Sequence, residues 1–228
     1  MCGRVVQLSI FGGALRAWPV DVAKALGGLI DKYNLCPTQR AARIMDDAGE
    51  LVVRKMRWGL LAPWVRDLKG SFSTINARVE TVAEKSSYRA AWKAPRRCLV
   101  PMQGWYEWRE VDVLGKRFKQ PFYIHAEDQL PMYAAGLWEP RRDFQPDDED
   151  GSLTIITTDA PARFDLHDRV PIFLPPDRAR EWMRSKPDDA MAMLLAAPFP
   201  EVQVVKVSTK VNSSRGNSGA PDFIEPIE

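Results

Sequence analysis

The sequence contains few of the residues on which metal-binding and disulfide-bonded proteins depend. Its 228 residues include only three cysteines and two histidines. Three cysteines are few and odd in number, which argues against a disulfide framework. Two histidines do not supply a histidine-rich metal site. We therefore expect no metal, no cofactor and a reducing, cytoplasmic setting.

Long apolar runs and a strong net charge are also missing. No stretch approaches about 18 consecutive apolar residues, so we expect no membrane span, and the start MCGRVVQLSI lacks the pattern of a secretory signal. Lys and Arg total 32 against 30 Asp and Glu, which gives a net charge of +2. With 45% apolar residues the chain has enough material for a core. We expect one domain over residues 1–228.

The near-neutral total conceals an uneven distribution of charge. Residues 54–97 contain 11 basic and 3 acidic residues, whereas residues 139–150 contain 6 acidic and 2 basic residues. The basic segment could face a DNA backbone. The acidic, turn-rich stretch 140–151 is expected to be an exposed loop.

The pattern of apolar residues predicts more strands than helices. Strands do not alternate with helices, which favours an α+β fold around an antiparallel sheet or barrel-like core, with a few peripheral helices. Pro121 within an expected strand indicates a sheet edge or a bulge. The expected strands are 4–10, 51–57, 97–108, 118–125, 132–138, 153–158 and 202–207, and the expected helices are 21–31, 79–93, 177–186 and 188–197.

Cys2 is the most distinctive candidate for chemistry. Once Met1 is removed, Cys2 carries both the α-amino group and a thiol, with ordinary pKa values of about 7.7–8.0 and about 8.5. This 1,2-aminothiol can attack an acyl carbon, as N-terminal nucleophile hydrolases do. It can instead condense with an aldehyde to an imine, which the thiol closes into a five-membered thiazolidine. The alternative is a chance residue at a disordered end, but the apolar segment that follows should tie the terminus into a sheet.

Glu107 and His167 are candidates for proton transfer. Glu107 lies among aromatic residues in GWYEW. Burial would raise the pKa of its carboxyl group and make it a candidate acid or base. Exposure to solvent would make it an ordinary polar residue on the outer face of a strand. His167 lies in a polar turn, LHDRVP, and histidine is well suited to move protons near neutral pH. A single histidine in a loop is also often structural.

Basic residues alternate with tryptophans in the basic segment, as in proteins that bind single-stranded nucleic acid. Pro63 would expose Trp64 on a turn, Asn76 could cap a helix, and Arg78 could hold a phosphate or pair with Glu80. The alternative is that the tryptophans belong to the core and the cations to a solvated face. Of the other thiols, Cys98 is expected in the core, and Cys36 has no CxxC partner.

Taken together, these segments resemble the SOS-response-associated peptidase (SRAP) family of abasic-site crosslinking proteins. The matching segments follow the family order over almost the whole chain, although Cys36 stands where the family often has Ala. They are MCGR at the start, YNLCP at 33–37, RWGLLAPW at 57–64, INARVET at 75–81, GWYEW at 104–108, QPFYI at 120–124, LHDRVP at 166–171 and a VN…FIEP tail at 211–226.

The resemblance implies a single SRAP domain that captures abasic sites in single-stranded DNA as a thiazolidine crosslink, in the DNA damage response. Cys2 would be the nucleophile, and Asn34 would orient the substrate or the amino terminus. Glu107 and His167 would transfer protons. The residues expected to bind DNA are Arg4, Trp64, Asn76 and Arg78.

The resemblance further implies a monomer that is cytoplasmic and associates with the nucleoid when bound to DNA. It leaves open the extent of AP lyase activity on the abasic site. Two alternatives remain: an N-terminal nucleophile hydrolase or peptidase that acts on amides through Cys2 and His167, and a non-catalytic nucleic-acid-binding protein in which Cys2 is incidental.

Overall fold

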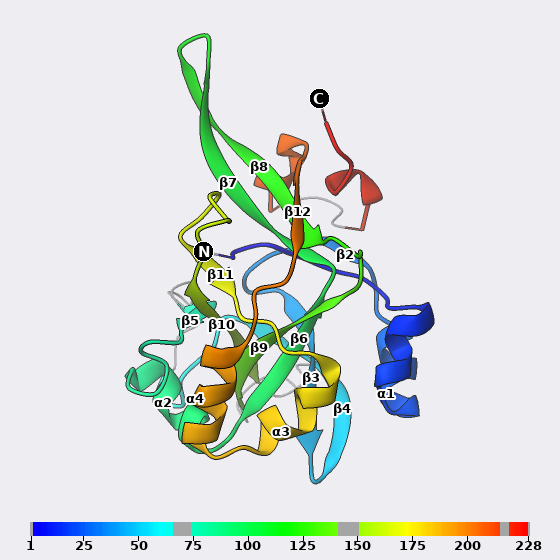
Figure 1. Cartoon of the computed structure of the whole chain (residues 1–228), viewed down its shortest axis with the longest axis vertical. Coiled ribbons are helices and arrows are strands. Elements are labelled where there is room, and N and C mark those ends of the chain that lie inside the picture. Colours follow the sequence, from blue (N-terminus) through cyan, green and yellow to red (C-terminus); the bar gives the residue numbers. More distant parts are fainter. Residues whose placement is uncertain (1, 66–73, 141–150, 215–218, 228) are drawn as a thin grey trace.

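The chain folds into two β-sheets with helices packed around one of them, as seen in a computed structural model (Figure 1). The structure describes residues 2–65, 74–140, 151–214 and 219–227. The expected acidic loop at 140–151 lies almost wholly outside the described residues.

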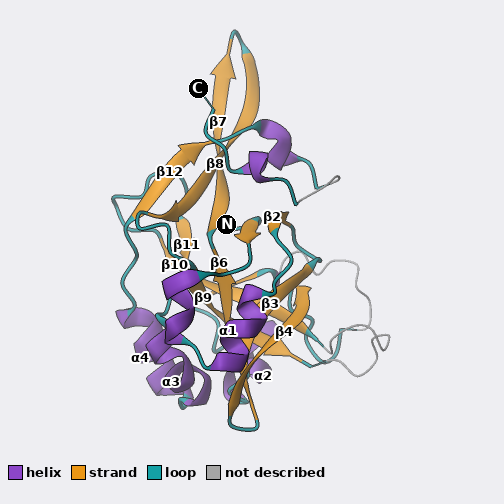
Figure 2. Cartoon of the chain, turned by 90° about the vertical axis from the view of Figure 1, so that its right-hand side faces the viewer, coloured by secondary structure: helices purple, strands orange, loops and turns teal. Residues whose placement is uncertain are grey.

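The first sheet is antiparallel throughout, with the strand order β12-β8-β7-β1-β2. Its two long central strands form a hairpin that extends well beyond the rest of the molecule (Figures 1 and 2). The strands are β1 (Val5–Gln7), β2 (Lys32–Leu35), β7 (Gly104–Val113), β8 (Lys116–Ala126) and β12 (Val202–Lys206).

The second sheet closes on itself as a barrel. Each strand of the series β10-β4-β3-β6-β9 pairs with the next, and β9 pairs with β10 again. Two further strands, β5 and β11, pair with β10 outside this ring. The strands are β3 (Arg40–Asp47), β4 (Glu50–Trp58), β5 (Asn76–Arg78), β6 (Arg97–Met102), β9 (Met132–Glu139), β10 (Ser152–Asp159) and β11 (Arg169–Pro171).

The expected α+β fold with a barrel-like antiparallel core is therefore confirmed, with the exception that β10 runs parallel to β4 and β5. The helices lie beside the barrel (Figure 2). They are α1 (Val20–Gly27), α2 (Ser86–Lys93), α3 (Ala179–Arg184) and α4 (Pro187–Ala196), with short 3-10 turns at Gly12–Ala17, Pro176–Arg178, Thr209–Asn212 and Pro221–Phe223.

Alternation along the barrel strands produces two apolar clusters. On β6, Leu99 joins the cluster under the helices, whereas Cys98 and Val100 join the cluster that also contains Cys2 and Trp105 of the first sheet. The second cluster fastens the two sheets to each other, and all of these side chains are buried. Cys98 is thus a core residue, as expected.

Several expected elements have different limits in the structure. The strand expected at 97–108 is two strands in different sheets, and the chain crosses between the sheets at Gly104, where a Cβ atom would lie 2.2 Å from the Ile124 carbonyl oxygen. The helix expected at 79–93 begins only at Ser86, because Asn76–Arg78 pairs with β10 as a strand. The helix expected at 21–31 ends at Gly27, and β2 follows. Strands β2, β3, β5 and β11 were not expected.

Pro121 lies where the pairing of its strand changes. β12 pairs with Phe122–Ala126 of β8, so the remainder of β8 has β7 as its neighbour on one side. The sequence predicted an edge or a bulge at this proline, and the ladder with β12 begins at the next residue. A residue without a backbone N–H fits this position.

Candidate functional site

Cys2 lies at the junction of the two sheets. Strand β1 runs between β2 and β7, with Val5 opposite both Leu35 and Trp105, so the residues just before β1 lie beside the middle of β7. The Cys2 side chain is buried, and its backbone carbonyl accepts a hydrogen bond from Asn76 Nδ2 at 2.7 Å. Asn76 belongs to β5, which pairs with the barrel strand β10, so this bond fixes the start of the chain to the second sheet. It is a strand residue and not the helix cap that the sequence suggested.

The environment of the Cys2 thiol favours its protonated form. Burial raises its pKa well above the ordinary value, and the negative charge of Glu107 raises it further, while the backbone N–H of Arg4 lowers it. A thiol with a raised pKa reacts only when a nearby group removes its proton. The interaction with Glu107 identifies a carboxylate close to this thiol.

Glu107 is buried on β7, with only 2% of its surface exposed. Burial raises its pKa to about 7, and the positive amino terminus lowers it in part. At neutral pH the carboxyl group therefore exists in both its acidic and its basic form, which suits a group that gives and takes protons. This resolves the alternative that the sequence left open between a buried and a solvent-facing Glu107.

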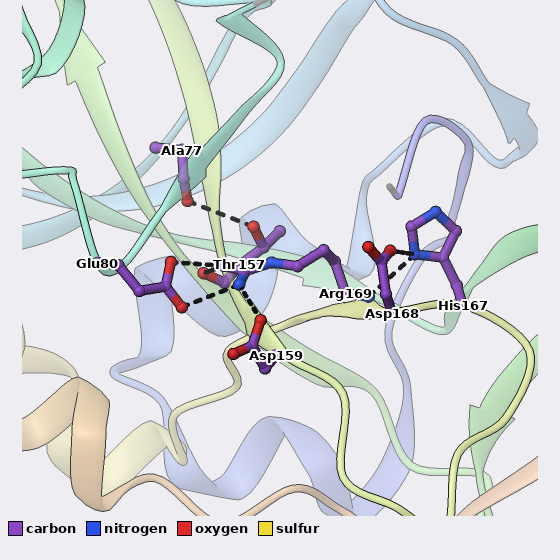
Figure 3. A network of polar contacts seen from close by, with 7 residues as sticks. All are labelled: Ala77, Glu80, Thr157, Asp159, His167, Asp168 and Arg169. Carbon is purple, nitrogen blue, oxygen red and sulfur yellow. Dashed lines mark hydrogen bonds and ion pairs between the residues drawn. The ribbon is translucent and has the colours of Figure 1, made fainter.

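His167 lies in the loop between β10 and β11, and two contacts hold its ring. Its Nδ1 accepts the backbone N–H of Arg169 at 2.9 Å and lies 2.7 Å from Asp168 Oδ1 (Figure 3). The neutral ring can accept the Arg169 N–H at Nδ1 in one tautomer and donate Nδ1–H to Asp168 in the other, and the charged ring can also donate Nδ1–H to Asp168. The ring thus keeps its orientation in both protonation states. Burial lowers the His167 pKa, so the neutral form predominates at pH 7.

The next residue, Arg169, anchors this loop to the barrel. Its buried guanidinium binds both carboxylate oxygens of Glu80 at 2.9 Å, contacts Asp159, and donates to the Thr157 carbonyl at 2.7 Å (Figure 3). Thr157 Oγ1 in turn donates to the Ala77 carbonyl at 3.5 Å. These contacts join β11, β10 and the turn after β5, so they fix the positions of His167 and Asn76 relative to each other.

Asn34 and Arg4 form a second polar clamp at the same end of the first sheet. Arg4 Nη1 donates to Asn34 Oδ1 at 2.9 Å and to the Val211 carbonyl at 2.7 Å. Asn34 Nδ2 donates to the Ser213 carbonyl at 3.1 Å. The clamp ties β1 and β2 to the carboxy-terminal segment. Cys36 lies next to it and is buried, with its Sγ 3.3 Å from the Asn34 carbonyl.

Two of the residues expected to bind DNA are accessible from solvent. Arg78 ends β5, two residues after Asn76, and its side chain is exposed. Trp64 is 56% exposed on the turn after β4, which agrees with the expected Pro63-Trp64 turn. The alternative that the tryptophans belong to the core holds for Trp58 and Trp92, which are buried.

The structure thus brings five of the eight expected residues around the start of the chain: Cys2, Arg4, Asn34, Asn76 and Glu107. His167 and Glu107 both interact with Asp168. Within the described residues, no group of three or more His, Cys, Asp or Glu side chains is arranged to hold a metal ion. Among the same residues no helix is long and apolar enough to cross a membrane.

Sequence reasoning did not assign roles to Asp168, Arg169 or Asp159, and it considered Glu80 only as a partner of Arg78. Asp168, Arg169 and Glu80 lie within the quoted segments LHDRVP and INARVET. A cation and two acids in short motifs were a signal, but their pairing depends on β10, which lies between the two segments in space. The structure pairs Glu80 with Arg169 and leaves the neighbouring Arg78 exposed.

Comparison with known proteins agrees with this fold. The family model "SOS response associated peptidase (SRAP)" matches residues 1–214. The chain is 34% identical over 227 residues to the abasic site processing protein YoaM of Bacillus subtilis, covering 96% of each chain. It is 29% identical over 235 residues to the abasic site processing protein YedK of Escherichia coli, covering 100% of each.

A crystal structure of a protein from Bacteroides thetaiotaomicron has the same fold, with a TM-score of 0.76 and 24% identity over 100% of both chains. The two sheets, the buried Cys2 and the family match together define the class. The chain belongs to the SOS response associated peptidase family.

Proposed function

We propose that this protein senses abasic sites in single-stranded DNA and captures them covalently through Cys2, as part of the response to DNA damage. The observation that carries the proposal is the position of Cys2. Asn76 Nδ2 donates to the Cys2 carbonyl at 2.7 Å, and Cys2 lies beside Glu107, a carboxyl group with a pKa of about 7. Relatives named abasic site processing proteins support the choice of substrate. The reaction requires only one copy of the chain and does not require a metal ion.

The proposed reaction begins with removal of Met1, which places the α-amino group on Cys2. An abasic sugar is mostly a closed hemiacetal, so a base must take the proton of its hydroxyl while the ring oxygen gains one. Neutral His167 is the proposed base, in the tautomer that donates Nδ1–H to Asp168 and takes the proton on the lone pair of Nε2. The opened sugar then presents an aldehyde to the amine.

The following steps form a thiazolidine. The amine adds to the aldehyde carbon, and the resulting hydroxyl leaves as water with a proton from Glu107, which gives a protonated imine. The Cys2 thiol then transfers its proton to the Glu107 carboxylate while sulfur bonds to the imine carbon, and the ring nitrogen keeps its proton. One C–N and one C–S bond replace the C=O bond, with loss of one water. Elimination from the same imine would cleave the strand and constitute AP lyase activity.

The remaining residues are proposed to hold the DNA. Arg78 is exposed beside Asn76 and would bind a phosphate next to the lesion, and Trp64 would stack on a base. Arg4 adds positive charge at the same end of the sheet while its Nη1 holds Asn34. Asn34 and Asn76 would keep the amino terminus in place.

A denaturing gel with a single-stranded oligonucleotide that carries one abasic site tests the proposal. The wild type, with Met1 removal confirmed by intact mass, should yield a slowly migrating adduct that survives heating. Cys2→Ala keeps the amine and can form only a hydrolysable imine, so its stable adduct should be lost. Cys36→Ala removes another buried thiol and serves as the matched control, with full crosslinking expected.

Two results would reject the proposal. The first is a Cys2→Ala adduct as abundant and durable as that of the wild type. The second is turnover of peptides or amides through Cys2 without any DNA adduct, which would select the N-terminal nucleophile hydrolase instead. Cleaved oligonucleotide on the same gel would measure AP lyase activity.

A further inference from the structure

The most prominent feature outside the candidate site is the hairpin of β7 and β8, which we call the β7–β8 arm (residues 108–121). It extends away from both sheets (Figures 1 and 2). The register pairs Trp108 with Pro121 and Val113 with Lys116, and the turn at Leu114-Gly115 has φ angles of 54° and 77°. The arm begins one residue after Glu107. It is therefore a continuation of the strand that carries a central residue of the candidate site.

One face of the arm is continuous with Glu107. Side chains alternate along a strand, so Arg109 and Val111 share the face of Glu107, and the register places Phe118 and Lys116 on the same face of β8. Phe118 is 40% exposed. Arg109 and Lys116 are also exposed, so this face presents an aromatic ring and an apolar side chain between two cations.

The other face of the arm neutralises its own charges. Glu110 lies directly opposite Lys119, and Asp112 directly opposite Arg117. Opposite charges that face each other across a ladder form favourable pairs. On this face two cations therefore meet two carboxylates, whereas the charged side chains of the arm on the Glu107 face are both cations.

The base of the second face is already occupied. Trp108 Nε1 donates to Asn212 Oδ1 at 2.6 Å, and Asn212 Nδ2 donates to the Lys119 carbonyl at 3.1 Å. The carboxy-terminal segment thus packs against the neutral face. On the Glu107 face the Arg109 guanidinium lies over the Phe122 ring, 5.7 Å from its centroid, and also forms an exposed ion pair of 3.1 Å with Asp165. Such a pair is worth little in water and can be exchanged for a phosphate.

We propose that the Glu107 face of the β7–β8 arm binds the single-stranded DNA that leads away from the abasic site. This inference rests on the proposed function, because it assigns a path to the DNA beyond the lesion. Arg109 and Lys116 would contact phosphates, and Phe118 would stack on a base. Interleaved rings and cations bind single strands without regard to sequence, which suits a protein that meets lesions in any sequence.

The dimensions of the arm determine which DNA can use it. Phe118 lies opposite Val111, four positions beyond Glu107 or about 13 Å at 3.3 Å per residue. Leu114 lies seven positions beyond Glu107 or about 23 Å. At about 3.4 Å per stacked nucleotide, a strand that ends one or two nucleotides from the lesion would not reach Phe118. The arm should therefore affect the affinity for long oligonucleotides and leave that for short ones unchanged.

Equilibrium binding to oligonucleotides with a central tetrahydrofuran abasic analogue tests the inference, because the analogue has no aldehyde and cannot be crosslinked. Fluorescence anisotropy would compare the affinity for a long oligonucleotide, with ten nucleotides on each side of the analogue, with that for a short one, with two on each side. Phe118→Ala should weaken binding of the long oligonucleotide about tenfold, through loss of one stacked base. Lys116→Gln should lower the slope of log affinity against log salt by about 0.7.

Lys119→Gln is the matched control, since it makes the same chemical change on the neutral face of the same strand. It should leave both the affinity and the salt slope unchanged. All three variants alter exposed residues, and equal thermal midpoints would confirm their folding. The inference is wrong if Phe118→Ala binds the long oligonucleotide as the wild type does, or if Lys119→Gln changes the salt slope as much as Lys116→Gln.

The outcome is separable from that of the proposed function. Crosslinking of a short aldehyde-bearing oligonucleotide requires Cys2 but not the arm. Normal crosslinking together with unaltered DNA binding by the arm variants would overturn only the inference that DNA binds to the arm. Loss of crosslinking in the wild type would overturn the proposed function, while the non-reactive analogue would still decide whether DNA lies on the arm.

Discussion

Glu107 and Glu80 reach the His167–Asp168–Arg169 segment from different sheets, and their pKa values shift in opposite directions. Glu107 lies on β7 of the first sheet, where burial raises its pKa to about 7. Glu80 follows β5 of the second sheet, where hydrogen bonds from Arg169 lower its pKa. Both are glutamates, so the difference arises from what surrounds them: apolar neighbours in one case and a guanidinium in the other.

The contrast assigns different tasks to the two carboxyl groups. A group with a pKa near the working pH can both donate and accept a proton, and Glu107 meets that condition. A carboxylate paired with arginine stays charged and holds position, as Glu80 does. The polar cluster around Arg169 fixes the loop, and the adjoining region around Cys2 and Glu107 keeps a proton available.

The largest expected effect is on the rate of crosslinking in Glu107→Gln. The amide has a similar shape but cannot exchange a proton, so the rate should fall about a hundredfold or more. A time course of adduct formation from pH 5 to 8 would measure it, and the wild type should show a pH dependence near 7 that the variant lacks. Glu110→Gln changes an exposed glutamate three residues along the same strand and should leave the rate unchanged. A wild-type rate in Glu107→Gln would remove Glu107 from the mechanism.

The next effect concerns the Arg169 cluster and the stability of the fold. Arg169→Met retains length but removes the contacts with Glu80, Asp159 and the Thr157 carbonyl. The free energy of unfolding should fall by about 3 kcal/mol, because the substitution removes the contacts between a buried arginine and its partners. Urea denaturation at pH 7 would measure the change. Arg178→Met breaks an exposed ion pair with Glu181 and should not shift the midpoint. An unchanged midpoint in Arg169→Met would show that the cluster does not stabilise the loop.

The contrast between the two glutamates also shows what the sequence could and could not predict. The long strands and the barrel-like core follow from local pattern, because runs of β-branched and aromatic residues predict strands wherever they occur. β5 and β11 are three residues long, and their pairing with β10 is decided by partners distant in sequence. The motif INARVET alone therefore also fits a helix cap at Asn76.

The candidate residues themselves were named from motifs, whereas their environments required the structure. Alternation placed Glu107 with Trp105 on one face but could not say whether that face was buried, because both faces of β7 are covered at this point: Trp105 and Tyr106 are each fully buried. Likewise, INARVET contains two candidates for an ion pair in Arg78 and Glu80, and the partner that Glu80 takes is Arg169 from another strand. Pairing across a sheet is not encoded in the spacing of one motif.

The smallest expected effect concerns stability. The Glu107→Gln substitution, which should slow crosslinking, should at the same time stabilise the fold at high pH. Burial raises the Glu107 pKa from 4.5 to about 7. The folded protein thus binds a proton that the unfolded chain has released between these two values. Ionising Glu107 destabilises the folded state progressively as the pH rises from 4.5 to 7, and the full cost is present above pH 7.

The full shift corresponds to at most about 3 kcal/mol, which local relaxation reduces to about 2 kcal/mol. The Glu107→Gln variant has no ionisable group at this position, so this destabilisation is absent. The difference in unfolding free energy between variant and wild type should therefore rise by about 2 kcal/mol between pH 4.5 and pH 8, whatever the packing effect of the amide. His167 titrates in both proteins, so its contribution cancels in the difference. Urea melts of both proteins at four pH values would measure it, and a difference independent of pH would mean that Glu107 is as easily ionised in the folded chain as in water.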